Sequence, residues 1–409
     1  MYKKIILVIL SLSLIFSTAY ATTWSDISSL IERHSTELKS AQKAVDSSLL
    51  SYQQAYTSFF PQLSGSLSYS QSTTSTSSAF SQYSYGLTAQ HDLFSGGSSI
   101  FAMQSAYASY QSALATLKRG EADVYYNALK AYNNLLVAQE EIKIQTKIVA
   151  KRKENSRLIN LSYLSGREDR GNLLQTEADQ ASAEHKLATA KRSLALAKLR
   201  LFQIVGVDID FAEEFISPKI LADEISFEAL LQQLPEYNKE KAAVDLASIN
   251  QKSATWSFLP SLSLSGTLRK TGSSWPPETD SSSWTLGLSY PFLNSGSDIF
   301  AQIINNVKLD QAKLSLEQFS KESLYTLQES YLNLEDALEG LRVAKTYATA
   351  TEERAKIAQA KYLNGLISYD EWYRIENDYI SSQGNYLLAK SKALDAEALW
   401  YRSYGGILK

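Results

Sequence analysis

The second half of the chain repeats the first half at a constant shift of 199 residues. The repeated positions include aromatic, proline and glycine residues, the types that mark turns and helix ends. They pair as Phe59 and Phe258, Pro61 and Pro260, Gly97 and Gly296, Tyr163 and Tyr362, and Gly166 and Gly365. Self-similarity at a fixed period indicates copies of one structural unit. We therefore expect two modules with the same order of elements.

The first 21 residues have the features of a signal peptide. Lys3 and Lys4 precede an apolar stretch over 5–16, and Ala19-Tyr20-Ala21 has the small-x-small pattern of a cleavage site. No other run of apolar residues is long enough for a membrane-spanning helix. The sequence contains no cysteine, which excludes disulfides and lipidation of an amino-terminal cysteine. We predict a chain that is exported and not lipidated.

Composition gives no sign of catalysis or of nucleic-acid binding. The formal net charge is −3, and the basic clusters lie within segments of mixed charge. The histidines His34, His91 and His185 are isolated, and no motif of a nucleophile, phosphate loop or dinucleotide site is present. We predict a non-enzymatic protein without a metal or cofactor and without a nucleic-acid partner.

Periodicity, prolines and glycines divide each module into a helix, two strands, a long helix and a second helix. The modules are predicted over 22–206 and 226–409, joined by a linker at 207–225. The first module has expected helices at 26–58, 98–163 and 168–205 and strands at 62–70 and 83–93. The second has expected helices at 226–257, 297–362 and 368–404 and strands at 261–269 and 283–292. The predicted fold class is mainly α with a small antiparallel β part.

The predicted strands alternate between apolar and hydroxyl-bearing residues. Leu63, Leu67 and Tyr69, for example, interleave with serines. Period-two alternation gives a sheet one apolar and one polar face. The apolar face could pack on the protein's own helices in water or could contact lipid, and composition leaves both possibilities open. The joining segments Gln71–Gln82 and Lys270–Ser283 are polar and are predicted to be loops.

The predicted helix at 98–163 is far longer than a globular core requires. Apolar, aromatic or small residues recur at steps of three and four from Ile100 to Val149. This heptad spacing indicates coiled-coil-like packing, and a helix of this extent is roughly 100 Å long at about 1.5 Å per residue.

Four strands cannot close a barrel by themselves, and open strand edges are not tolerated in hydrocarbon. If the strands span a membrane, sister chains must complete the sheet. Two chains give about eight strands, whose interior side chains fill, whereas three give twelve and leave room for an open bore. A spanning sheet therefore predicts a homotrimer with a 12-stranded barrel of four strands per chain.

Over essentially its whole mature length, the chain resembles the TolC-like outer-membrane efflux proteins. The resemblance rests on the duplication, the aromatic-x-Pro before each first strand, the exit Leu93-Phe94-Ser95-Gly96-Gly97, and the Tyr-x-x-Gly turns at Tyr163 and Tyr362. It implies a homotrimer with a β-barrel in the outer membrane of a Gram-negative bacterium, above a helical periplasmic tunnel. The implied partners are outer-membrane lipid, a periplasmic adaptor (membrane fusion) protein and an inner-membrane RND or ABC transporter.

The resemblance also places a periplasmic gate at the tips of the helical hairpins. The gate tyrosine is Tyr362, and its usual acidic partner falls at Asn172. The two acidic positions that constrict the bore fall at Glu371, with Asp370 beside it, and at Arg374. Because residues three apart on a helix are neighbours, the hypothesis is a constriction closed by mixed-charge links. An exposed ion pair without a gating role is the alternative.

The turns themselves are candidates for contact with the adaptor. They contain Gly166 and Arg167 in the first hairpin and Gly365 and Leu366 in the second. A solvated turn, with Arg167, Glu168, Asp169 and Arg170 exposed to water, is the competing interpretation. For the whole chain, the alternatives to a transport duct are a secreted structural coiled-coil protein and a periplasmic adaptor.

Overall fold

The computed structural model describes residues 21–74, 77–212, 225–291 and 295–407. Five predictions fall partly outside these ranges: the signal peptide up to residue 20, the loop at 71–82 (75–76), the linker (213–224), the strand at 283–292 (292), and the end of the second module (408–409). Within the described ranges, no helix contains a stretch long and apolar enough to cross a membrane.

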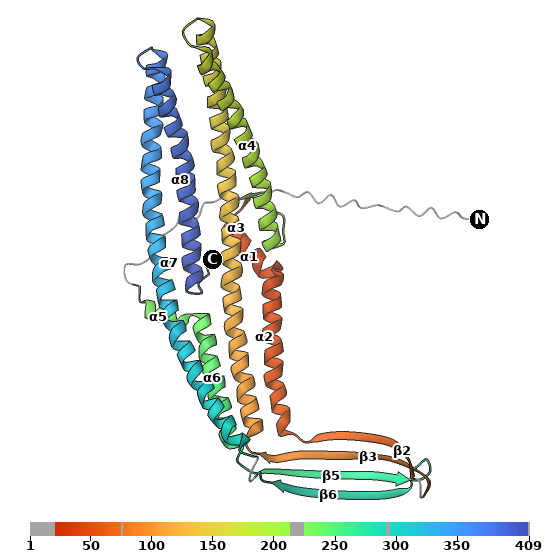
Figure 1. Cartoon of the computed structure of the whole chain (residues 1–409). Coiled ribbons are helices and arrows are strands. Elements are labelled where there is room, and N and C mark those ends of the chain that lie inside the picture. The colour runs from red at the N-terminus through yellow and green to blue at the C-terminus, as the bar shows by residue number, and fades with distance from the viewer. Residues whose placement is uncertain (1–20, 75–76, 213–224, 292–294, 408–409) are drawn as a thin grey trace, which may run out of the picture.

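Two antiparallel helical hairpins dominate the molecule (Figure 1). The first consists of α3 (Ser98–Leu164) and α4 (Arg170–Val205), and the second of α7 (Ser297–Leu363) and α8 (Tyr369–Ser403). Each long helix has 67 residues, which corresponds to about 100 Å. The hairpins lie side by side with both turns at the same end, and α3 also packs against α8.

Shorter helices complete each rod beyond the end of the hairpin. In the first module these are α1 (Trp24–His34), α2 (Thr36–Ala55) and the 3-10 helix η1 (Tyr56–Phe59). In the second they are α5 (Phe227–Gln233) and α6 (Pro235–Trp256). α2 packs along α3 and α6 along α7, so each long helix has a partner over both parts of its length.

The prediction of one helix over 26–58 is wrong, because the chain breaks at Ser35. Ser35 has non-helical backbone angles, with φ −59° and ψ 116°. Its hydroxyl accepts a hydrogen bond from the backbone N–H of Leu38 and so caps the start of α2. The break in the second module is at Leu234, which is 199 residues further on and has nearly the same backbone angles. There Pro235 disfavours a helical conformation at the preceding residue. The duplication thus preserves a kink that only one module marks with proline.

The sheet contains four antiparallel strands in the order β2, β3, β5, β6. They are β2 (Gln62–Thr74), β3 (Ser77–Ser95), β5 (Ser261–Gly272) and β6 (Thr279–Ser289). β3 pairs with β5, so this sheet joins the two modules. The strands of the first module continue through most of the segment predicted as a loop at 71–82. A further parallel pair, β1 (Ala21–Thr22) with β4 (Phe211–Ala212), was not predicted.

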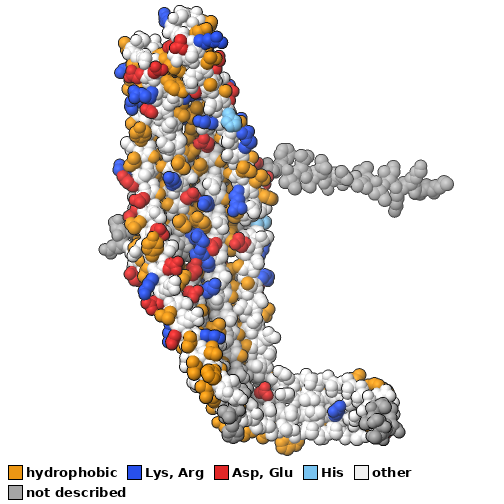
Figure 2. Space-filling model, viewed as in Figure 1, with side chains coloured by type: hydrophobic (Ala, Val, Ile, Leu, Met, Phe, Trp, Pro, Cys, Tyr) orange, Lys and Arg blue, Asp and Glu red, His pale blue; other side chains and the backbone are white. Residues whose placement is uncertain are grey.

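The four-stranded sheet projects from the end of the helices opposite the hairpin turns, and no helix covers it (Figure 1). Its apolar side chains are therefore exposed: Leu63 at 77%, Leu288 at 71% and Trp284 at 78%. The other face carries the alternating serines and threonines. In Figure 2 charged side chains are spread over the helices, whereas the visible side of the sheet is mostly uncharged.

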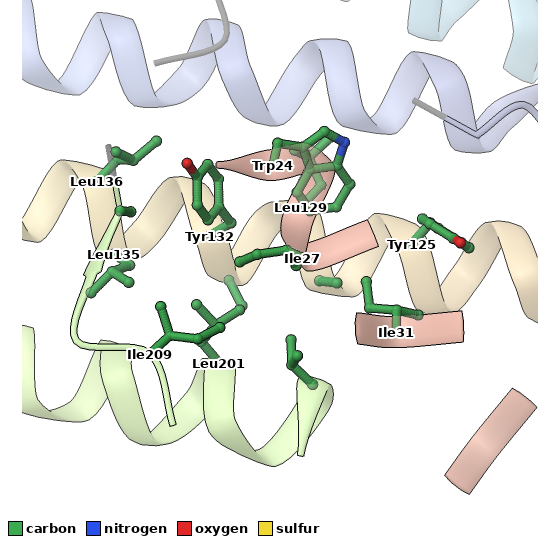
Figure 3. Close-up of a cluster of buried hydrophobic side chains, with 14 of the residues drawn as sticks. Trp24, Ile27, Ile31, Tyr125, Leu129, Tyr132, Leu135, Leu136, Leu201 and Ile209 are labelled. Atoms are coloured by element: carbon green, nitrogen blue, oxygen red, sulfur yellow. The ribbon is translucent and has the colours of Figure 1, made fainter. Parts of the chain in front are cut away.

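The main hydrophobic core lies about halfway along the first rod, where the kinked amino-terminal helix meets the long hairpin. Trp24, Ile27 and Ile31 of α1 pack against α3 and α4 around Tyr132 and Leu201 (Figure 3). The ring centroids of Trp24 and Tyr132 are 5.9 Å apart. The second module has a cluster at equivalent positions of its repeat, which contains Leu231, Leu234, Leu327, Leu334 and Trp400. In each module, a hydrophobic cluster therefore packs the short helices against the long hairpin.

Leu135 tests the contribution of this core, because its side chain is completely buried. We expect Leu135→Ala to lower the free energy of unfolding by about 2–5 kcal/mol, since it removes buried methyl groups and leaves a cavity. The change is measured by denaturant unfolding followed by circular dichroism. Lys118→Ala, at an exposed position of the same helix, serves as the control. Equal stability of the two variants would contradict this role of the core.

Candidate functional site

The tips of the two hairpins have the same backbone structure. Gly166 and Gly365 adopt a left-handed conformation with φ of +73° in both cases. In each tip the glycine and the following residue donate backbone hydrogen bonds of 2.9 Å to the last helical turn, to Tyr163 and Ser162 in the first and to Tyr362 and Lys361 in the second. This is the Schellman arrangement, in which glycine avoids the steric cost of a side chain. Asp169 and Ser368 then cap the returning helices.

An aromatic cluster lies directly behind the second tip. Tyr362 stacks on Trp372 with ring centroids 4.6 Å apart and planes 7° apart. Tyr369 contacts both rings and stacks on Tyr373 at 5.6 Å. Trp372 is 2% exposed and packs against Ile159 of the first hairpin. The aromatic rings thus fix the second tip and attach it to its neighbour.

A hydrogen bond joins the two tips, but its acceptor is not the predicted residue. The hydroxyl of Tyr362 donates to Oε1 of Glu168 at 2.9 Å. Asn172, the position predicted for the partner, instead donates through Nδ2 to the other oxygen of the same carboxylate at 3.0 Å. Burial, and secondarily the bond to Glu168, raise the pKa of Tyr362, which therefore stays protonated as a donor. The acidic partner is present four residues before the predicted position, in the turn that precedes α4.

The residues predicted to constrict the bore lie on the exposed surface of the tip. Asp370, Glu371 and Arg374 are all exposed in the single chain. Among the described residues, Glu371 and Arg374 do not come within salt-bridge distance of each other, so the predicted pair within one helix does not form here. Both are free to meet groups outside this chain.

The turn residues predicted to contact a partner are also exposed. Arg167 projects from the first tip, and Leu366 at the second is 71% exposed. Gly166 and Gly365 have no atom within 4 Å of the position that a side chain would take. The tips therefore present two similar, open turns to their surroundings.

A buried polar cluster joins the two hairpins behind the aromatic rings. Asn155 of α3 donates through Nδ2 to Oε2 of Glu376 of α8 at 2.6 Å. Arg152 donates to Asn377 of α8, and its Nη1 lies 3.7 Å from a carboxylate oxygen of Asp179 of α4. Arg152, Asn155 and Glu376 are each at most 8% exposed. Because an unpartnered buried charge is costly, this cluster specifies how the two hairpins align.

Burial also changes the chemistry of the cluster. It raises the pKa of the Glu376 carboxyl, and the hydrogen bond from Asn155 and the charges of Arg152 and Lys151 offset the increase only in part. The site contains buried ionisable groups and stacked rings. Within the described residues, no three histidine, cysteine or acidic side chains are grouped to hold a metal ion. The arrangement is suited to holding two helical hairpins together.

Sequence reasoning missed Glu168, Trp372, Arg152 and Glu376. Glu168 lies in the charged turn for which contact with an adaptor and exposure to water were the two interpretations. The other three lie on helix faces whose neighbours come from a different hairpin. One signal was available: Trp372 lies three residues after Tyr369, a spacing that places two large aromatic rings on one face of a helix.

Comparison with known proteins identifies the family. A model described as outer membrane efflux protein matches residues 27–207 and 227–406, one match for each module. The chain belongs to the outer membrane efflux protein family. The cation efflux system protein CusC of Escherichia coli K12 is 24% identical over 396 residues, which are 90% of this chain and 83% of CusC. Toxin and drug export protein A of Aggregatibacter actinomycetemcomitans is 21% identical over 290 residues, 69% of this chain but only 62% of that protein.

Solved structures of outer membrane channels have the same fold. A crystal structure of CusC matches with a TM-score of 0.85 at 19% identity and covers 96% of both chains. The open-state MtrE outer membrane channel of Neisseria gonorrhoeae matches with a TM-score of 0.83 at 18% identity, over 94% of this chain and 89% of MtrE. At this level of identity the structural likeness shows the fold, with its hairpins and projecting sheet.

The polar cluster predicts a pH-dependent stability. A carboxyl whose folded pKa is raised binds its proton more tightly in the folded state, so its contribution is complete below its ordinary value of 4.5. It is lost as pH rises through the folded pKa. We expect Glu376→Gln to weaken this decline of stability with rising pH, measured as the thermal midpoint from acid to neutral pH. Asp378→Asn, an exposed change on the same helix, is the control. An unchanged pH profile in Glu376→Gln would contradict the assignment.

Proposed function

We propose that three copies of this chain form a duct in the outer membrane of a Gram-negative bacterium. The four-stranded sheets close into a 12-stranded barrel, and the six hairpins form a tunnel that reaches into the periplasm. The duct receives cargo from an inner-membrane transporter of the RND or ABC class through a periplasmic adaptor protein. Its action is passive conduction.

The observation that carries this proposal is the four-stranded sheet. Among the described residues, no helix covers either of its faces, and no strand pairs with either of its outer edges. β2 and β6 are the outermost strands and pair on one side only. In lipid each unpaired backbone group is costly, so a spanning sheet has to close. In water the exposed leucines would favour aggregation. Closure with sister sheets places the leucine face against lipid and the hydroxyl face toward a water-filled bore.

The distribution of aromatic residues agrees with a membrane setting. Tyr69, Tyr83, Tyr85 and Trp275 form a group of neighbouring rings at the distal end of the sheet. Phe94, Trp256, Phe258 and Tyr290 lie near the end that joins the helices, and all four are exposed. Leucines such as Leu87 and Leu264 lie between the two groups. Aromatic girdles on either side of an apolar band are typical of outer-membrane barrels.

The helices also carry apolar surface that one chain does not cover. Along α7, Val307 is 62% exposed, Leu314 66%, Tyr325 64% and Tyr347 58%. Apolar residues repeated along one rod are suited to packing against the rod of a neighbouring subunit. A secreted structural protein with its strands folded on its own helices is disfavoured, because the sheet stands away from them.

The relatives' names indicate the range of possible cargo. CusC is a cation efflux system protein, and AprF of Pseudomonas aeruginosa is an alkaline protease secretion protein. Both classes of system pass cargo out of the cell. We infer that this duct, too, takes its cargo from whichever transporter the adaptor connects to it.

At the periplasmic end, we propose that the hairpin tips close the tunnel. The bond between Tyr362 and Glu168 and the rings of Trp372 hold the two tips of a subunit together. The exposed Asp370, Glu371 and Arg374 meet their equivalents across the threefold axis. The turns at Gly166, Arg167, Gly365 and Leu366 contact the adaptor, which opens the end by separating the hairpins.

The trimer can be tested by cross-linking, and the absence of cysteine makes every introduced thiol unique. One cysteine replaces Ser66 on β2, and a second replaces Ser283, Thr285 or Ser289 on β6 in turn. Since a disulfide requires Cβ atoms about 4 Å apart, we expect one combination to give oxidised trimers on denaturing gels. The control replaces the neighbouring Leu286, which lies on the opposite face. If no combination cross-links chains within membranes, the closed barrel is contradicted.

The tip contact can be tested by recording conductance in lipid bilayers. Tyr362→Phe removes the hydroxyl donated to Glu168 but keeps the ring on Trp372. Because a hydrogen bond to a charged group contributes about 1.5–3 kcal/mol, we expect more frequent opening and a higher mean conductance. Tyr163→Phe is the matched control, since Tyr163 is the equivalent residue of the first module and is exposed. Identical conductance in the two variants would exclude the contact from the gate.

A further inference from the structure

The hydroxyl face of the sheet carries charge at two positions in the described strands, Asp92 and Arg269. Apart from Phe80, which lies opposite Ser72 near the distal end, the remaining side chains on this face are serine, threonine, glutamine and glycine. In the register, Arg269 lies opposite Gly86 and Asp92 lies opposite Ser263. Six positions separate them along each strand, or roughly 20 Å at about 3.3 Å per residue. Asp92 is near the helices, whereas Arg269 is near the distal end, three positions before β5 ends at Gly272.

The guanidinium of Arg269 is held in place across β3. Its Nη2 donates to Oγ of Ser84 at 2.8 Å, and that oxygen is 2.7 Å from Oγ of Ser68 on β2. Gly86 makes this crossing possible. A Cβ at residue 86 would lie 2.6 Å from the carbonyl oxygen of Leu268 and 3.3 Å from Cβ of Arg269. Glycine at this position lets β5 and the arginine approach β3 closely.

The charge of Arg269 is not neutralised within the described part of the chain, where no carboxylate lies within 4 Å of it. The neighbouring cation, Lys270, does have a carboxylate partner. Lys270 points to the apolar face and pairs with Asp280 at 3.1 Å. A charge facing lipid is costly, so pairing there is expected, whereas a charge facing water can remain available. A guanidinium has five N–H donors, and Ser84 takes one of them.

From this geometry we propose that Arg269, repeated three times around the bore, forms an anion-binding ring near the distal mouth of the barrel. The ring takes solutes that carry carboxylate, phosphate or sulfate groups and favours their passage over that of cations. The proposal rests on the proposed trimeric duct. The planar guanidinium group can bind such an oxyanion by donating two parallel hydrogen bonds to it. Serine oxygens hold the side chain without cancelling its charge.

The test is ion selectivity of the purified full chain in planar bilayers. The reversal potential is recorded under a potassium chloride gradient for the native chain, Arg269→Gln and Arg269→Lys. Because the Debye length is about 10 Å at 0.1 M salt, three fixed charges around the bore act on ions that pass close to them, and we expect a change of about twofold in the permeability ratio. We expect Arg269→Gln to shift the anion-to-cation permeability ratio toward cations by that factor. Arg269→Lys should retain the native ratio.

The matched control is Lys270→Gln, one residue away on the opposite face, which should leave the ratio unchanged. A measurement on the native chain alone gives independent support: citrate added to the distal chamber should reduce conductance more than citrate added to the helical side. Equal reversal potentials for the native chain and Arg269→Gln, or symmetric block by citrate, would overturn the ring. Failure of the native chain to form channels at all would instead overturn the duct.

Discussion

The unpaired outer edges of β2 and β6 are the constraint on which the rest of this structure depends. Each edge presents a row of backbone donors and acceptors, and the adjoining face is rich in leucine. In lipid the edge groups of a four-stranded sheet would lack hydrogen-bond partners, and in water its edges and leucine face would favour aggregation; in the proposed duct, sister chains supply the missing partners. The sheet joins both modules through β3 and β5, so closure of the proposed barrel would also set the positions of the four helical elements that enter it.

The helical part transmits that arrangement to the opposite end of the molecule. At mid-height, two equivalent cores fix the kinked short helices against α3 and α7. Beyond them the hairpins depend on the polar cluster around Arg152 and Glu376 and on the stacked rings at Tyr362 and Trp372. Polar contacts are specific in geometry yet contribute less than a large apolar core. They suit the proposed gate, which holds a closed arrangement and also releases it.

Much of this architecture could be predicted because it is encoded in local patterns. Heptad spacing from Ile100 to Val149 indicates the long helix, and alternation of leucine with serine indicates strands. Local patterns do not reveal the break at Ser35. Serine is compatible with a helix, and only the hydrogen bond from the backbone N–H of Leu38 to its hydroxyl makes it the cap of a new helix. They also miss the partner of Tyr362, because a neighbouring carboxylate can reach the same hydroxyl from a different turn. The Arg152 cluster brings together residues more than 200 positions apart, and periodicity carries no information about such a contact.

The mass of the protein in detergent tests the central claim most directly. The purified chain, extracted from membranes and kept in mild detergent, is measured by light scattering coupled to size exclusion, with the detergent contribution subtracted. The account predicts a particle containing three chains that persists on dilution. A stable particle containing a single chain, with its strands still protected from exchange, would contradict closure of the sheet by sister subunits.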